Sequence, residues 1–239
     1  ELIEALQAVN PNLVVVLLSG NAVEMPWEAK VPAIVEGWYL GSMGGKSLAN
    51  VLSGKVNPSG KLPFSFPVKL EDCGAHSFGE ICYPGDSITE KYLDDILVGY
   101  RWHDTKKIAP KYSFGHGLSY TDFKYGKAEA SAKEMTESGT ILINVPVTNV
   151  GDRKGKETVQ LYIGDDKASV MRPLKELKGF EKISLAPGET RNVTFTIKAD
   201  DLKFYDEASK GWKAEPGKFT AYIGSSSTDI RCKIPFTLK

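Results

Sequence analysis

Two apolar runs without alternation dominate the first part of the chain. Residues 13–18 read Leu-Val-Val-Val-Leu-Leu, and residues 33–39 form a second apolar segment. A run without alternation is typical of a strand buried on both faces, which requires helices on both sides. Helical periodicity precedes the first run at 1–9 and follows the second at 46–52. The pattern predicts an α/β layer in which 13–18 and 33–39 pair in parallel, with too few strands for a complete open sheet.

Beyond residue 126 the apolar positions alternate with a period of two. Turn sequences at 149–152, 186–189 and 215–218 separate the alternating segments. About seven short strands in roughly 110 residues are typical of an immunoglobulin-like sandwich. Pro146 has no N–H to donate, so it predicts an edge strand or a bulge. The residues expected to face the core include Ile141, Ile143, Val145, Val147, Val159, Leu161, Ile163, Val193, Phe195, Ile197, Phe219, Ala221, Ile223, Ile234, Phe236 and Leu238.

The segment between these two patterns, residues 67–126, has little periodicity. A connection of this length is usually functional or wraps over another domain. It carries eight aromatic residues from Tyr83 to Phe123, more than a freely swinging linker needs, so we expect it to be packed down. Arg101 is the expected buried anchor, because one guanidinium can bond several carbonyl oxygens.

Composition limits the classes of partner. Lys and Arg total 30, as do Asp and Glu, so the formal net charge is zero. This balance argues against nucleic acid or an anionic membrane as a partner, and uncharged ligands are expected. No apolar run approaches the roughly 20 residues that span a bilayer. The chain begins at Glu1 within a helical pattern, which we expect to be a position inside a larger protein.

The cysteines number three, Cys73, Cys82 and Cys232. An odd number argues against a disulfide framework, and free thiols are favoured, although the sequence leaves a pairing of Cys73 with Cys82 open. Together with His76 these cysteines lack the paired short spacings of a zinc site.

Several common catalytic motifs are incomplete. The loop at 41–47 ends in Gly-Lys-Ser, but Leu40 stands where a phosphate-binding loop requires glycine, so a turn between strand and helix is the favoured interpretation. Ser19 does not lie in a Gly-x-Ser-x-Gly elbow. The histidines follow no pattern that pairs a base with a nucleophile; they are His76, His103 and His116.

Glycoside hydrolysis requires a pair of carboxylates. Near the ends of the predicted parallel strands, where open sheets present ligand sites, the sequence places Glu24, Glu28 and Glu36. They are weak candidates, because sequence cannot show two of them converging. Tryptophan faces can stack on sugar rings, although buried packing is the commoner role. Trp38 is the preferred stacking candidate, ahead of Trp27, Trp102 and Trp212.

Six motifs resemble one enzyme family and follow its order along nearly the whole chain. They are the segment 1–12 with Val14-Val15-Val16, Gly44-Gly45-Lys46-Ser47-Leu48-Ala49, Asn57-Pro58-Ser59-Gly60-Lys61-Leu62-Pro63, Val98-Gly99-Tyr100-Arg101, Phe114-Gly115-His116-Gly117-Leu118-Ser119-Tyr120-Thr121, and Arg172-Pro173-Leu174-Lys175-Glu176-Leu177-Lys178-Gly179-Phe180. The chain resembles the C-terminal half of a family 3 glycoside hydrolase of the β-glucosidase and β-xylosidase type.

The resemblance implies a retaining, exo-acting β-glycosidase, with β-glucosidase favoured, that works through a covalent glycosyl-enzyme and needs no cofactor. In that family an N-terminal (β/α)₈ barrel supplies the aspartate nucleophile, an α/β sandwich domain supplies the acid/base glutamate, and a fibronectin type III-like domain follows. The barrel has no counterpart here, and the family's glutamate precedes the helix at 1–9. The resemblance therefore assigns no catalytic, cofactor-binding or metal-binding residue to this chain, which we expect to be inactive alone.

The expected fold class is α/β plus all-β, with a partial α/β sandwich layer followed by a fibronectin type III-like β-sandwich. The expected division is 1–66 for the layer, 67–126 for an ordered connection and 127–239 for the sandwich. The expected partners are a glycoside substrate in the parent protein and the missing barrel domain, and the resemblance favours a periplasmic or secreted location. The alternative is a stand-alone carbohydrate-binding or adhesion module, which would not need part of an α/β sheet with broken edges.

Overall fold

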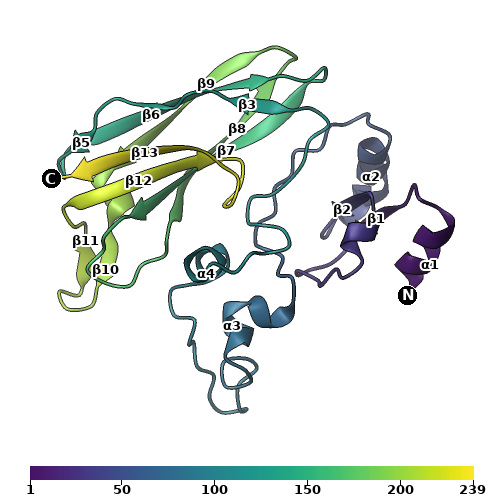
Figure 1. Ribbon diagram of the computed structural model, residues 1–239, viewed down its shortest axis with the longest axis horizontal. Coiled ribbons are helices and arrows are strands. Elements are labelled where there is room, and N and C mark those ends of the chain that lie inside the picture. Colours follow the sequence, from purple (N-terminus) through teal and green to yellow (C-terminus); the bar gives the residue numbers. More distant parts are fainter.

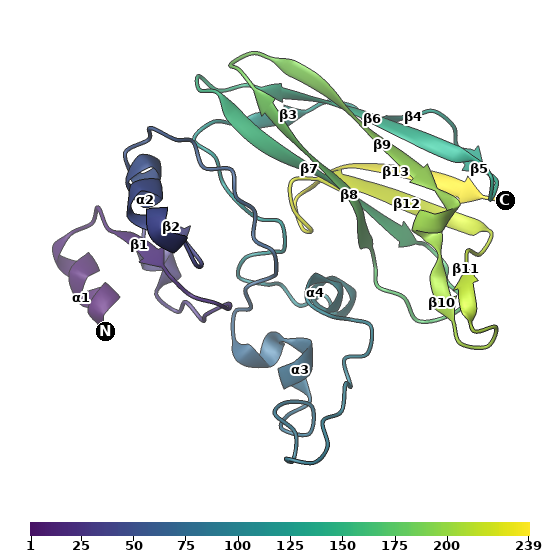
Figure 2. The same cartoon turned by 180° about the vertical axis from the view of Figure 1, so that it is seen from behind.

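The computed structural model describes all 239 residues. Figure 1 shows a small α/β layer and a large β-sandwich, joined by a connection that carries α3 (Gly74–Ser77) and α4 (Tyr100–Lys106). The view from behind in Figure 2 shows the same separation, with the N-terminus in the layer and the C-terminus at the far end of the sandwich. None of the helices has the length and apolar composition that a membrane-spanning helix requires.

The layer contains a two-stranded parallel sheet, as predicted. Strand β1 (Val14–Leu17) pairs with β2 (Ala33–Glu36), with Val14 opposite Ala33. The remaining elements are α1 (Leu2–Val9), the 3₁₀ turns η1 (Glu28–Lys30) and η2 (Gly41–Met43), and α2 (Gly44–Leu52). The Gly-Lys-Ser loop therefore forms a 3₁₀ turn that runs directly into a helix.

The expectation that residues 13–18 are buried on both faces is wrong for this chain. Val14 is 43% exposed and Leu18 is 65% exposed, and no residue of α1, β1 or β2 is fully buried. The physical reason is that two strands and two short helices cover only part of one another. The apolar surface suited to a larger sheet is therefore left open.

The connection begins with η3 (Leu70–Asp72) and α3 and returns toward the sandwich through α4. Trp102 of α4 is buried and donates its indole N–H to the carbonyl of Asp72 at 3.0 Å. This bond joins α4, near the end of the connection, to η3 near its start. The three cysteines are free thiols, with Cys82 buried.

The sandwich has the predicted two sheets. The five-stranded sheet runs β5 (Glu134–Met135), β13 (Ile230–Leu238), β12 (Gly217–Gly224), β7 (Gly155–Asp165) and β8 (Glu176–Leu185). In the second sheet β6 (Thr140–Asn149) pairs with β3 (Phe123–Tyr125) and β4 (Glu129–Ala130) on one side and with β9 (Thr190–Lys198) on the other.

The core lies between these sheets and contains 21 buried residues. The period-two pattern is confirmed because inward positions such as Ile141, Val159 and Ile223 are fully buried, and Phe195 retains only 7% exposure. With β3–β6–β9 opposed to β12–β7–β8, the chain has the predicted fold class of a partial α/β layer followed by an immunoglobulin-like sandwich.

Pro146 does not mark an edge strand, because β6 is paired on both sides. Its carbonyl accepts the N–H of Gly126 at 2.8 Å, so the proline nitrogen also faces the break between β3 and β4, where no ladder bond is required. The missing donor is therefore placed at an interruption in the neighbouring strand.

A small hairpin extends from the end of the sandwich. The 3₁₀ turn η4 (Ala199–Leu202) leads into β10 (Phe204–Asp206), which pairs antiparallel with β11 (Gly211–Lys213). Leu202 and Ala214, on either side of the hairpin, belong to the buried core. The hairpin is thus anchored at its base.

Candidate functional site

The layer, the connection and the sandwich meet at the glycine-rich segment 114–121. This segment pairs with the residues that follow the Asn-Pro-Ser-Gly turn: the N–H of Leu62 donates to the carbonyl of His116 at 2.8 Å, and the N–H of Gly115 donates to the carbonyl of Leu62 at 2.8 Å. An isolated bridge between Phe66 and Tyr112 continues the pairing. Two motifs that lie far apart in the sequence therefore form one ladder.

Both glycines in this ladder are required by close approach. Gly115 has a φ of +80°, and a Cβ there would lie 2.3 Å from the side-chain oxygen of Gln160. A Cβ at Gly117 would lie 2.1 Å from the carbonyl oxygen of Gly60. Gly115 therefore allows the ladder to lie against the sandwich, and Gly117 allows it to lie against the turn at 57–60.

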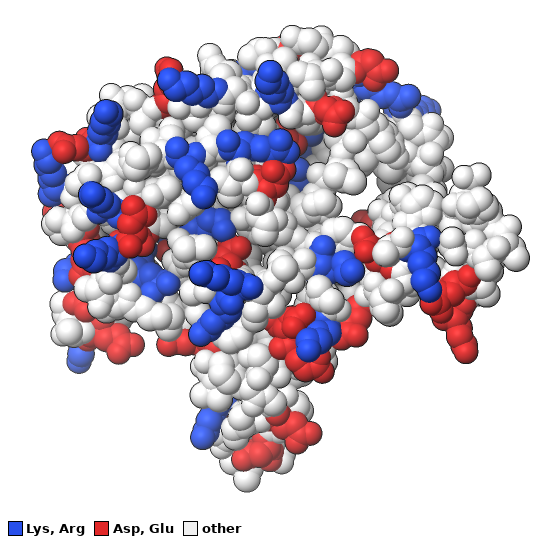
Figure 3. All heavy atoms as spheres, viewed as in Figure 1, with Lys and Arg blue, Asp and Glu red and all other residues white.

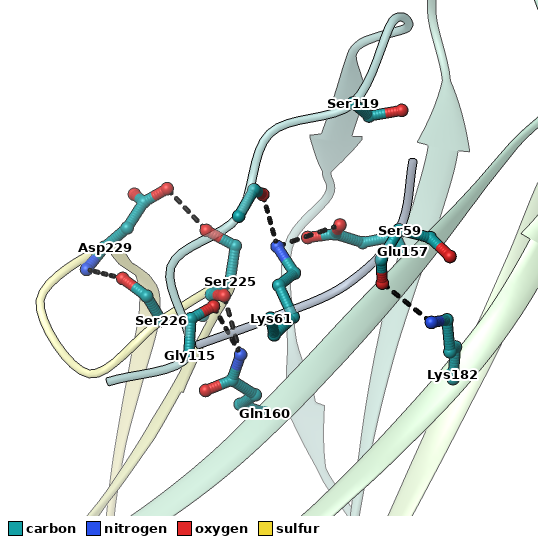
Figure 4. Close-up of polar contacts among 12 residues, drawn as sticks. Ser59, Lys61, Gly115, Ser119, Glu157, Gln160, Lys182, Ser225, Ser226 and Asp229 are labelled. Carbon is teal, nitrogen blue, oxygen red and sulfur yellow. Dashed lines mark hydrogen bonds and ion pairs between the residues drawn. The ribbon is translucent and has the colours of Figure 1, made fainter. Parts of the chain in front are cut away.

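Gln160 connects three elements from within β7. It is buried, and its amide nitrogen donates to the carbonyls of Gly115 at 3.3 Å and Ser225 at 2.6 Å. Its amide oxygen accepts the hydroxyl of Tyr162 at 2.5 Å. Figure 4 shows the amide nitrogen of Gln160 directed toward the carbonyl oxygens of Gly115 and Ser225.

An ion pair between a partly buried lysine and a buried glutamate lies beside this amide. Lys61 Nζ is 3.4 Å from a carboxylate oxygen of Glu157 and donates to the carbonyl of Gly117 at 3.0 Å. The hydroxyl of Tyr125 donates to the other carboxylate oxygen at 2.8 Å, and burial together with the nearby Glu157 carboxylate raises the pKa of Tyr125. We call Lys61, Gly115, Glu157, Gln160 and Ser225 the junction cluster (Figure 4).

The loop between β12 and β13 completes the contact. The N–H of Ser227 donates to the carbonyl of Phe114 at 2.9 Å, and the hydroxyl of Ser113 donates to that of Ser226 at 3.2 Å. Asp229 holds the loop closed by accepting the hydroxyl of Ser225 at 2.6 Å. The hydroxyl-rich sequence of this loop thus serves docking.

Asn57, the first residue of the Asn-Pro-Ser-Gly turn, bonds to two other parts of the chain. Its side-chain oxygen accepts the hydroxyl of Ser119 at 2.9 Å and the N–H of Tyr120 at 2.7 Å, while its amide nitrogen donates to the carbonyl of Lys154 at 3.1 Å. One side chain therefore joins the turn at 57–60, the glycine-rich segment and the start of the sandwich.

A second contact joins α4 to the start of β8 and to Lys175, the residue directly before it. Asp104 and Lys175 form a buried ion pair at 2.5 Å, and the hydroxyl of Tyr100 accepts the N–H of Leu177 at 2.7 Å. Burial raises the pKa of Asp104, against the opposing effect of Lys175.

Arg101 contributes to the same contact in a way the sequence did not indicate. Its guanidinium lies 3.3 Å from a carboxylate oxygen of Glu176, its side chain is 38% exposed, and its buried Nε has no partner. The expected set of bonds to several carbonyl oxygens is therefore replaced by one ion pair to the sandwich.

The three carboxylates singled out in the sequence bond to different segments. Glu24 accepts the N–H of Leu70 at 2.6 Å, and Glu36 accepts the N–H of Trp38 at 2.9 Å. Glu28 accepts the hydroxyl of Tyr112 at 2.8 Å, and this bond lowers the pKa of Glu28. Burial and the same bond raise the pKa of Tyr112 to about 12. Each carboxylate thus accepts a structural hydrogen bond, which is local for Glu36 and joins distant segments for Glu24 and Glu28.

The histidines lie apart from one another. His103 is buried with Nδ1 3.1 Å from the carbonyl of Ile108, and His76 packs edge-on against Tyr83. His116 stacks on Tyr112 with 5.1 Å between ring centroids, and burial with the nearby Lys61 lowers its pKa. No group of three or more His, Cys, Asp or Glu side chains is placed to hold a metal ion.

The tryptophans differ in exposure. Trp38, the preferred stacking candidate, packs against Phe64 with 5.1 Å between ring centroids, and Trp102 is buried. Trp212 in β11 is 70% exposed. The sequence analysis preferred Trp38 to Trp212, and the pattern of a three-residue strand does not show which of its faces is exposed.

The chemistry of the junction cluster is that of a structural contact. Its ammonium and carboxylate neutralise each other, and the amide of Gln160 is bonded at both ends. Groups engaged in this way orient segments rather than attack a bond.

Figure 3 shows positive and negative side chains interspersed over the visible face, which fits the zero net charge and the absence of a single charged patch on that face.

Comparisons with known proteins match both parts of the chain. The model of the Glycosyl hydrolase family 3 C-terminal domain matches residues 1–120, and that of the Fibronectin type III-like domain matches residues 157–227. Beta-glucosidase BoGH3A of Bacteroides ovatus is 61% identical over 99% of this chain and 32% of its own length. Thermostable beta-glucosidase B of Acetivibrio thermocellus is 48% identical over 97% of this chain and 30% of its own.

Solved structures agree. The β-glucosidase DesR from Streptomyces venezuelae, in complex with D-glucose, has a TM-score of 0.93 and 38% identity over 100% of this chain and 30% of its own. The Kluyveromyces marxianus β-glucosidase, also in complex with glucose, has a TM-score of 0.91 and 38% identity over 100% of this chain and 28% of its own. The chain thus spans about a third of the length of the relatives it matches.

Proposed function

Because the chain belongs to the family 3 glycoside hydrolases, we propose that it forms the C-terminal part of an exo-acting β-glucosidase that removes terminal β-linked glucose from glycosides. The observation that carries this proposal is the 61% identity to a β-glucosidase, which extends over 99% of the chain through both the layer and the sandwich. The relatives' printed names agree on the class of activity.

The proposed reaction is a double displacement with retention of configuration. In the first step one carboxylate attacks the anomeric carbon, and a second carboxyl group donates its proton to the leaving aglycone. In the second step that second group acts as a base and deprotonates the water that releases the sugar from the covalent intermediate. We place both carboxylates outside this chain. The bonds made by Glu24, Glu28 and Glu36 support that assignment, because each carboxylate already accepts a structural hydrogen bond.

The proposed role of this chain is to complete the α/β domain and to hold the sandwich in a fixed position. Exposed apolar side chains in the layer support the first part: Leu2, Val9, Val14, Leu18, Tyr39 and Met43 are 43% to 86% exposed. Covering such surface with further strands and helices would stabilise the whole protein. The junction cluster and the α4 contact support the second part.

The division that fits this role is 1–66 for part of the α/β domain, 67–126 for an ordered connection and 127–239 for the sandwich. Strand β3 at Phe123–Tyr125 already pairs with β6, so the connection ends inside the second sheet. A stand-alone binding module, the alternative, accounts for the sandwich but gives no role to the exposed layer.

The test of this function uses the full-length protein. Proton NMR during hydrolysis of a nitrophenyl β-glucoside distinguishes the anomer that forms first. The proposal expects β-glucose first, followed by mutarotation, with the β-xyloside cleaved more slowly. Release of α-glucose first would contradict the retaining mechanism, and absence of any turnover on β-glycosides would contradict the function.

A further inference from the structure

The hairpin at the end of the sandwich displays two aromatic side chains to solvent. Tyr205 of β10 and Trp212 of β11 are directly opposite in the antiparallel register, with 6.0 Å between ring centroids and an angle of 79°. They are 52% and 70% exposed. Tryptophan is usually well buried, so an exposed pair on one hairpin is unusual for a soluble surface.

The hairpin holds these rings on a fixed support. Leu202 precedes it and is 1% exposed, and Ala214 follows it and is 8% exposed, both within the sandwich core. Figures 1 and 2 both place β10 and β11 at the end of the sandwich opposite the α/β layer. A ring on an anchored hairpin loses little freedom on binding, which favours recognition.

A hollow of about 540 Å³ lies beside Trp212. This volume falls within the roughly 300–1,000 Å³ of small-molecule sites. Its rim includes Ser138 and Thr140 and five charged residues, which are Glu137, Lys198, Asp200, Lys203 and Lys213.

Three of the five charged residues on this rim are in ion pairs, and the other two, Glu137 and Lys198, carry opposite charges. Lys203 lies 2.6 Å from Asp200, and Lys213 lies 3.2 Å from Glu215. A ligand with a full charge would have to compete with these pairs, whereas a neutral ligand with many hydroxyls can bond to their free donors and acceptors.

The chemistry of this surface matches one class of ligand. A β-linked glucopyranose carries its hydroxyls around the ring edge, so each face presents axial C–H groups that pack against a flat indole, while the edge hydroxyls need hydrogen-bonding groups nearby. Trp212 supplies the flat apolar surface, and the rim supplies the polar groups. We propose that Trp212, Tyr205 and the adjoining hollow bind a neutral β-linked glucan chain.

Affinity electrophoresis of the 239-residue chain tests this proposal without any hydrolysis. Native gels would contain a soluble mixed-linkage β-glucan at increasing concentration, and parallel gels would contain none. The wild-type chain should be retarded in proportion to the glucan, and Trp212→Ala should weaken the affinity about tenfold, as for an aromatic hot spot. Tyr205→Ala should weaken it less.

Phe180→Ala is the matched control, because Phe180 is 67% exposed on β8 of the same sandwich; it should migrate like the wild type. Unretarded wild-type protein, or equal retardation of Trp212→Ala, would overturn the proposal. Stronger retardation by polygalacturonate would also overturn it, because lysines rather than the aromatic face would then select the ligand. Self-association lost in Trp212→Ala without glucan retardation would identify the surface as a contact between copies. These outcomes are independent of whether the parent protein hydrolyses glucosides.

Discussion

Phe195 shows how much of the sandwich depends on single core residues. Its ring is 7% exposed within the 21-residue core. Phe195→Ala should lower the free energy of unfolding by about 3–5 kcal/mol, because both transfer and cavity terms are lost. The control Phe180→Ala removes a ring that is 67% exposed and should change it by about 0.5 kcal/mol or less. Urea unfolding measures both, and a Phe195 effect below about 1 kcal/mol would mean that the ring does not fill the core.

His116 should make stability depend on pH in a defined direction. Burial and Lys61 lower its folded pKa below the ordinary value of 6.5. The unfolded state therefore binds a proton first as the pH falls, and stability declines from about pH 6.5 downward until the folded histidine is also protonated. His116→Gln should show a smaller loss between about pH 7.5 and pH 5. An equal loss in both proteins would assign the pH dependence to other groups.

For single residues, the sequence predicts a position well where adjacent residues along the chain determine which way a side chain points. Alternation at Val159 and Ile223 predicts inward positions, because successive strand side chains point to opposite faces. Alternation cannot reveal that Lys61 meets Glu157 or that Gln160 bonds Ser225, since those partners lie far apart along the chain. Nor could it show that Arg101 faces a carboxylate rather than carbonyls.

The glycine-rich segment 114–121 can pack as it does only because its backbone lies very close to that of the turn at 57–60. Gly117→Ala places a Cβ 2.1 Å from the carbonyl oxygen of Gly60, a backbone atom that cannot move cheaply. We expect a loss of several kcal/mol or separation of the ladder from the turn, detectable as faster proteolysis within 67–126. Gly45→Ala is the control, because nothing lies within 4 Å of its Cβ position in α2; it should be neutral or slightly stabilising. Equal behaviour of the two variants would refute the close approach.

Asp104 of α4 and Lys175, the residue before β8, should be energetically coupled. Asp104→Leu leaves Lys175 charged and buried, which costs about 3–5 kcal/mol. The double variant Asp104→Leu with Lys175→Met removes both charges and should recover most of that loss. A double-mutant cycle in urea measures the coupling. Additive effects would show that the pair at 2.5 Å contributes no net interaction.

Element types were easier to predict than their limits and partners. The parallel pair at 13–18 and 33–39 and the alternating strands follow from periodicity. The helix α4 lay in a segment without a clear pattern, because it is only seven residues long and is held by tertiary contacts such as that of Trp102 with Asp72. Pro146 misled because a central strand can carry proline where its neighbour is interrupted.

Across the whole molecule, the connection should be ordered unevenly. The amides of Lys111 and Tyr112 donate to Phe66, and that of Gly115 donates to Leu62, so this part should exchange hydrogen slowly in the full-length protein. The tip around Ile88, which is 94% exposed, should exchange fast. Hydrogen exchange resolved by peptide measures the contrast. Fast, uniform exchange from Tyr92 to Phe123 would show a flexible tether and remove the positioning role.

We propose that this chain supports glycoside hydrolysis in the full-length protein without supplying the reacting carboxylates. The most direct test is the turnover of a nitrophenyl β-glucoside by the purified 239-residue chain, expressed in a host lacking its own β-glucosidase, beside the full-length protein at equal concentration. We expect activity in the full-length protein and none in the chain alone. Turnover by the chain that rises with its concentration and disappears in Glu28→Gln or Glu36→Gln would instead place the catalytic carboxylates within these residues.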